Sequence, residues 1–93
     1  MKDLAFRLDV SINDKTGRAQ AAYLQVRNGK VAETREVSPG RAFADYDDSG
    51  SLVGIEFLAS CTVATLDRVT QDEPDSVREF FRSVTPHELV GAE

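Results

Sequence analysis

The stretch LAFRLDVSI, residues 4–12, decides the fold class of this chain of 93 residues. Apolar side chains occupy every second position in it, at Leu4, Phe6, Leu8, Val10 and Ile12. Side chains of a β-strand point alternately to its two faces, so this pattern predicts a strand with one buried face. A protein with such a strand is built around a sheet that something else must cover.

Further strands are predicted at residues 18–27, 30–38, 41–47 and 52–59. The pair Asn28-Gly29 favours a tight hairpin, because a type I′ turn needs positive φ at both central residues. This hairpin would pair Val26 with Val31 and would place Glu33 and Arg35 on a nominally apolar face. We therefore expect the third strand at an edge or beside a partner, and it is the first candidate for pairing with another chain.

The turn Asp47-Asp48-Ser49-Gly50 predicts a second hairpin, with Ala44 opposite Ile55 and Tyr46 opposite Val53. These four residues and Phe57 would then face the core. The opposite face would carry Phe43, Asp45, Asp47, Gly54 and Glu56.

After Ala59 the spacing of apolar residues changes from every second position to the spacing of a helix. Val77, Phe80, Phe81 and Val84 form the apolar stripe of an amphipathic helix, which Asp72 or Asp75 could cap. Its acidic residues, Glu73 among them, are expected to be solvated. Residues 62–69 favour a short helix, and Thr85-Pro86-His87-Glu88 is typical of a capping box that opens one more turn. The prediction is an α+β fold: one domain, with an antiparallel β-meander of about five strands over residues 1–60. Helices in residues 61–93 would pack on one face.

Charge is divided unevenly along the chain, whose net charge is −5. Residues 1–41 carry eight basic and five acidic side chains, a net charge of +3. Residues 42–93 carry three basic and eleven acidic side chains, a net charge of −8. This balance argues against a nucleic-acid partner. The apolar runs are too short to span a membrane, and the charged N-terminal stretch does not resemble a signal peptide. The single Cys61 offers no internal disulfide, so we expect a cytoplasmic protein. A domain this small favours a homodimer or small homo-oligomer.

From about Ala19 to Ser60 the chain resembles a family of short bacterial proteins, domain of unknown function 2283. The resemblance rests on residues 45–50 (DYDDSG) followed by 52–56 (LVGIE), with support from residues 22–24 and 31–34 and the pair Asn28-Gly29. Gln20 departs from the family pattern, which usually has an aspartate there, and the helices from Thr62 onward lie outside the resemblance. The family has no agreed activity. Some members accompany small toxin-like partners, which implies a protein partner but assigns no residue a role.

A calcium-loop spacing is the most specific motif. Asp45, Asp47 and Ser49 precede Gly50, and Glu56 stands at the twelfth position of the loop. An EF-hand loop is entered by a helix, however, whereas this one is predicted inside a hairpin. There Glu56 would lie roughly 20 Å up the return strand from the tip. An acidic turn whose aspartates accept local backbone N–H groups is the favoured interpretation, with cation binding as the alternative.

Two other groups of residues are candidates for catalysis. Asp45 and Glu56 could share a face as a carboxylate pair, but a structural partner for Glu56, such as Arg35, is the simpler interpretation. Cys61 and His87 are the only thiol and imidazole, and they fit a buried cysteine and a surface histidine better than a nucleophilic dyad. We therefore expect no catalytic residues and no cofactor. The predicted function is a non-catalytic interaction protein that self-associates or binds a protein partner, for example a basic one that the acidic half would attract.

Overall fold

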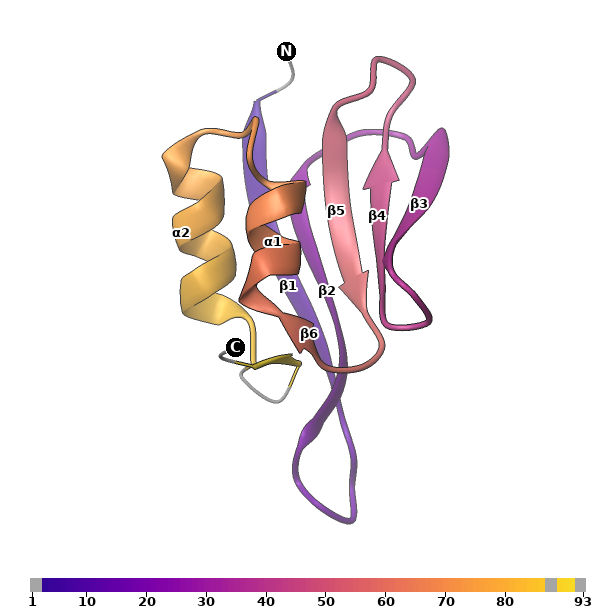
Figure 1. The fold of residues 1–93 in the computed structure, drawn as a ribbon, viewed down its shortest axis with the longest axis vertical. Coiled ribbons are helices and arrows are strands. Elements are labelled where there is room, and N and C mark those ends of the chain that lie inside the picture. The colour runs from indigo at the N-terminus through magenta and orange to yellow at the C-terminus, as the bar shows by residue number, and fades with distance from the viewer. Residues whose placement is uncertain (1–2, 87–88, 92–93) are drawn as a thin grey trace.

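The computed structural model describes residues 3–86 and 89–91. The large strands are β1 (Leu4–Ile12), β2 (Ala19–Arg27), β3 (Glu33–Ser38), β4 (Ala42–Tyr46) and β5 (Leu52–Phe57). They are followed by β6 (Cys61–Thr62), α1 (Val63–Val69), α2 (Asp75–Val84) and β7 (Val90–Gly91). Both helices lie on the same side of the sheet (Figure 1). The α+β class, the five antiparallel strands and the C-terminal helices on one face are thus confirmed.

The strand order is β1-β2-β5-β4-β3, with every neighbouring pair antiparallel. The expected hairpin at Asn28-Gly29 is wrong, since β2 pairs with β5 and the chain crosses one end of the sheet to reach β3 (Figure 1). The physical reason is burial. Placing β5 beside β2 sets Ile55 opposite Leu24 at the centre of the sheet. The charged strand β3 then lies at an edge, as its sequence predicted.

The β4–β5 hairpin follows the predicted register at one point and departs from it at another. Ala44 faces Ile55 as expected, but Tyr46 faces Leu52 and not Val53. A bulge lies between these two pairs, and Val53 is its extra residue. The bulge leaves Asp45 in the sheet and places Asp47 in the turn, where it is buried.

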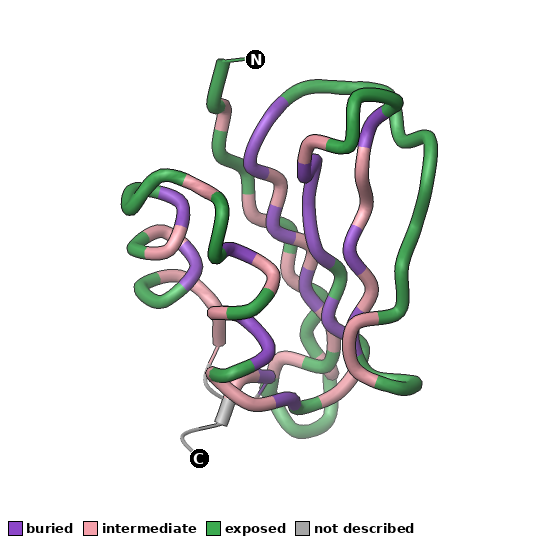
Figure 2. The backbone as a smooth tube through the Cα atoms, turned by 45° about the horizontal axis from the view of Figure 1, so that its top comes forward, coloured by how far each residue is buried: buried purple, intermediate pink, exposed green. Residues whose placement is uncertain are grey.

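One face of the sheet, here called the covered face, packs against the helices. Leu24, Ile55 and Phe57 lie fully buried on it. Val77 and Phe81 of α2 close the core from the other side, and the ring of Phe80 stacks on Phe6 of β1 with 4.4 Å between centroids. The apolar stripe of α2 therefore docks on the sheet of its own chain. Figure 2 shows buried positions alternating with less buried ones along β2 and β4, whereas β5 at the centre of the sheet is buried along most of its length.

The helical ends differ in how they are capped. The short helix predicted at residues 62–69 is confirmed as α1, and the Thr62 side chain accepts a hydrogen bond from the Thr65 N–H at 3.3 Å. Pro74 occupies the N-cap of α2, so the expected caps Asp72 and Asp75 are wrong. His87 and Glu88 of the predicted capping box lie outside the described residues. In the described part of the chain, no helix is long and apolar enough to cross a membrane.

An ion pair ties the sheet to the helical layer. The guanidinium of Arg27, at the end of β2, donates to the Glu73 carboxylate at 2.8 Å and 3.3 Å. Its side chain is 1% exposed and that of Glu73 is 13% exposed. Glu73 is therefore not solvated, contrary to the prediction. It neutralises a buried cation that would otherwise be costly to keep charged.

Candidate functional site: the open face of the sheet

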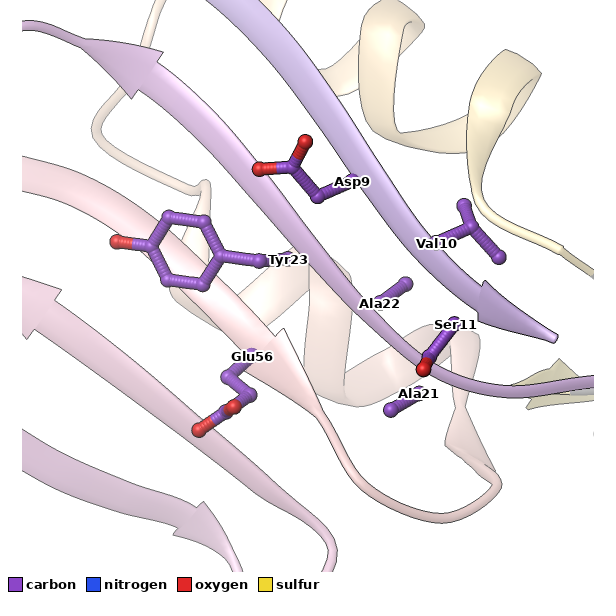
Figure 3. Close-up of a pocket in the computed structure, with 7 residues that line it drawn as sticks. All are labelled: Asp9, Val10, Ser11, Ala21, Ala22, Tyr23 and Glu56. Atoms are coloured by element: carbon purple, nitrogen blue, oxygen red, sulfur yellow. The ribbon is translucent and has the colours of Figure 1, made fainter.

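The face of the sheet opposite the helices, here called the open face, carries two straight rows of side chains. One row alternates acids and rings across all five strands: Asp9, Tyr23, Glu56, Phe43 and Glu36. We call it the acid–aromatic row. The second row runs beside it and consists of Arg7, Gln25, Gly54, Asp45 and Thr34. In Figure 3, Asp9, Tyr23 and Glu56 project from three adjacent strands, and the helices lie behind the sheet.

A hydrogen-bonded network joins the two rows at their centre. The Tyr23 hydroxyl donates to Asp45 Oδ2 at 3.0 Å, and the Thr34 hydroxyl donates to Asp45 Oδ1 at 2.6 Å. Tyr23 thus reaches from β2 across β5 to β4, while Thr34 comes from β3. Asp45 is consequently held from two strands at once.

Gly54 makes this reach possible. A Cβ atom at this position would lie 2.5 Å from the Tyr23 hydroxyl oxygen and 2.8 Å from the Leu24 carbonyl oxygen. Both distances are far below van der Waals contact, so any larger residue would displace the ring or the backbone of β2. A glycine inside a strand often marks such a close approach. Here it marks the place where the tyrosine crosses its neighbour.

The network also fixes the protonation of the phenol. Burial raises the pKa of Tyr23 well above 10.0, and the hydrogen bond to Asp45 and the charges of Asp45 and Glu56 raise it further. These causes all disfavour the phenolate. Tyr23 is therefore a neutral hydrogen-bond donor and a flat ring surface at physiological pH.

A shallow depression of about 330 Å³ lies beside this ring. Asp9, Tyr23 and Glu56 line it, together with the small side chains of Ser11 and Ala21 (Figure 3). Asp9 forms an exposed ion pair with Arg7 at 3.4 Å. Within the described part of the chain, the exposed Glu56 carboxylate accepts no hydrogen bond and forms no ion pair. Glu56 thus presents an uncompensated charge between two rings.

The aspartates of the calcium-loop spacing accept hydrogen bonds from other residues of the chain. Asp45 is bound by Tyr23 and Thr34, whereas Asp47 Oδ1 accepts from the Ser49 N–H, the Ser49 hydroxyl and the Ser51 N–H at 2.9, 2.6 and 2.9 Å. This is the acidic turn with local backbone partners that the sequence favoured. Among residues 3–86 and 89–91, no group of three or more His, Cys, Asp or Glu side chains is arranged to hold a metal ion.

The other predicted constellations have structural surroundings. Asp45 and Glu56 share the open face, but on different rows, and Asp45 is already bound. Arg35, suggested as a partner for Glu56, instead pairs with Glu33 at 2.8 Å and lies over the Tyr46 ring. Cys61 is buried, and its thiol donates to the Leu89 carbonyl oxygen at 3.8 Å. Burial raises the pKa of this thiol, which opposes a nucleophilic role. His87 lies outside the described residues.

The sequence placed Phe43, Asp45, Gly54 and Glu56 on this face but assigned no role to Tyr23 or Thr34. The contacts of Tyr23 depend on β2 pairing with β5, and those of Thr34 depend on the register of β3 against β4. One signal was available, namely the glycine in the middle of the strand at residues 52–57.

Comparison with known proteins places these residues in a family. Residues 17–60 match the model of a family described as a protein of unknown function (DUF2283), which confirms the family predicted from the sequence. No curated protein and no solved structure matches the chain. The matched segment spans β2 to β5 and contains the network of Tyr23, Thr34, Asp45 and Gly54, together with Glu56. The segment that builds the centre of the open face therefore belongs to the DUF2283 family of unknown function.

Proposed function

We propose that this protein is a non-catalytic interaction protein that binds a basic segment of a partner protein on its open face. The observation that carries the proposal is the unpaired Glu56 carboxylate, held between the rings of Tyr23 and Phe43 in the acid–aromatic row. A guanidinium or ammonium group could pair with this carboxylate and lie against a ring at the same time.

The spacing of the row supports a partner with repeated basic residues. Its acids stand on every second strand, and neighbouring strands are about 4.8 Å apart, so successive carboxylates are roughly 10 Å apart. A partner segment in the polyproline II conformation has three residues per turn and rises about 3.1 Å per residue, so it would bring every third side chain to the next acid. Asp9 is already paired with Arg7, but exposed ion pairs of this kind are weak and exchange readily.

The charge of the surface sets the kind of partner. Glu56, Asp9 and Glu36 outnumber Arg7 on this face, which therefore attracts cations and repels acids. A small basic protein of the toxin-like kind that the family resemblance suggests would fit this description. A cytoplasmic setting belongs to the same proposal, because the single Cys61 leaves the chain no internal disulfide to form.

Fluorescence anisotropy with a short labelled peptide tests the proposal. The peptide carries arginine at every third position, and a matched peptide carries glutamate there. We expect the arginine peptide to bind, to bind more weakly as salt rises, and to lose at least about fivefold in affinity with Glu56→Gln.

Glu79→Gln is the matched control, since it removes the same charge from the exposed side of α2. We expect it to leave the affinity unchanged. Equal binding of both peptides, no binding of either, or an equal loss with Glu79→Gln would overturn the proposal.

A further inference from the structure

The outer edge of β1 is an exposed strand edge to which another strand could bind. β1 is the first strand of the sheet, so it has a neighbour on one side only, and it is nine residues long. In the described residues, no loop or side chain donates to or accepts from its outer main-chain groups. α2 contacts β1 through the ring of Phe80, which leaves those groups unpaired. Such an edge is a template for another strand.

The opposite edge, β3, is better protected, although its charges made it the first candidate from sequence. It is six residues long, and the Arg68 guanidinium of α1 donates to the carbonyl oxygen of Val37 near its end. Glu36 Oε2 accepts from the Gly40 N–H at 2.8 Å, just after Pro39. The chain itself thus occupies part of this edge.

Exposed apolar side chains gather on β1. Leu4, Phe6 and Ile12 are 36%, 40% and 50% exposed. Charged residues alternate with them along the strand. Pairing with a similar strand would bury these apolar side chains and bring the charged ones side by side.

The sequence of β1 is complementary to itself when it is reversed. About a two-fold axis at Leu8, antiparallel pairing sets Leu8 opposite Leu8, Phe6 opposite Val10, and Arg7 opposite Asp9. The register of β1 against β2 is regular from Arg7 to Ser11, which keeps the side chains in strict alternation there.

We propose that two copies of this chain pair antiparallel through β1, centred on Leu8, to form one continuous sheet. Arg7 of each copy then faces Asp9 of the other on the open face, and the apolar pairs lie on the covered face. Opposite charges in directly facing positions stabilise a strand pair and like charges destabilise it.

The neighbouring registers are disfavoured by the same charges. An axis at Arg7 would set Arg7 opposite Arg7, and an axis at Asp9 would set Asp9 opposite Asp9. A slip of one residue would bring the charged face of one copy beside the apolar face of the other. Of these registers, the axis at Leu8 alone pairs opposite charges.

Sedimentation equilibrium of the full chain over a range of concentrations tests the dimer. We expect the parent to dimerise, and Arg7→Asp or Asp9→Arg to weaken the dimer about tenfold or more, because each makes the edge carry one sign of charge. The double variant Arg7→Asp/Asp9→Arg restores the reciprocal pairs and should dimerise again. An equimolar mixture of the two single variants should form a heterodimer.

Arg35→Asp on β3 is the matched control and should leave the dimer intact, with circular dichroism confirming that every variant is folded. A parent that stays monomeric, a double variant that does not recover, or a dimer that Arg35→Asp breaks would each overturn the proposal. Because Arg7 is outside the acid–aromatic row, failure here leaves the peptide-binding result at Glu56 standing.

Discussion

On the covered face of the sheet, Leu24, Ile55 and Phe57 are fully buried against α1 and α2, whereas on the open face Tyr23 is tied to Asp45 by a hydrogen bond of 3.0 Å. The residues of the covered face are stabilised by close packing and the exclusion of water. Those of the open face are stabilised by hydrogen bonds that cross three strands. The same strands serve both faces, because successive residues point in opposite directions. One face can therefore change its chemistry without changing the core behind it.

The largest expected change in stability comes from removing a phenylalanine ring, and one such variant on each face compares the two faces. Phe57→Ala on the covered face should lower the free energy of unfolding by about 3–5 kcal/mol, because it leaves a cavity in the core. Phe43→Ala, on the same pair of strands but on the open face, should cost less than half as much, since its ring is only half-buried. Urea unfolding measures both. Equal losses would show that the two faces do not differ in packing.

A smaller effect is expected where the open face touches the backbone. Gly54→Ala should lower the free energy of unfolding by about 1–3 kcal/mol, the usual cost of overpacking. The methyl group would meet the Tyr23 ring at 2.7 Å and the Leu24 carbonyl oxygen at 2.8 Å. Urea denaturation gives the change in stability. A variant as stable as the parent would mean that Tyr23 does not lie over Gly54.

The smallest effect concerns a single hydroxyl. Tyr23→Phe keeps the ring and removes the donor to Asp45, which retains its bond from Thr34, so the loss at neutral pH should be about 0.5–1.5 kcal/mol. The folded state holds the phenolic proton more tightly than the unfolded chain, whose tyrosine pKa is near 10.0. This contribution is complete below pH 10 and is lost as the pH rises above it. The stability gap between parent and variant should therefore stay constant up to about pH 10 and narrow between about pH 10 and pH 11 in urea titrations. A constant gap would contradict the assignment.

Local sequence patterns predicted the helices and strands well, but they predicted poorly which strands pair with each other. The alternation in residues 4–12 and the stripe at Val77, Phe80 and Phe81 depend on each residue's near neighbours, and both elements formed as expected. Asn28-Gly29 is also a local signal, but burying β5 beside β2 outweighs one turn preference. The bond from Tyr23 to Asp45 and the ion pair of Arg27 with Glu73 follow from that arrangement, so no local pattern could reveal them.

The pairing of β2 with β5 also bears on how the chain reaches its native state. The β3–β4 and β4–β5 hairpins close short loops, whereas Ala22 meets Phe57 only after the whole of β3 and β4 has been passed over. Closing the longer loop costs more chain entropy before any contact compensates for it. We expect the three-stranded unit β3–β4–β5 to form early and the docking of β2, which brings β1 with it, to set the folding rate. Until that step is complete, both the open face and the edge of β1 are absent, so neither can engage a partner before the chain has folded.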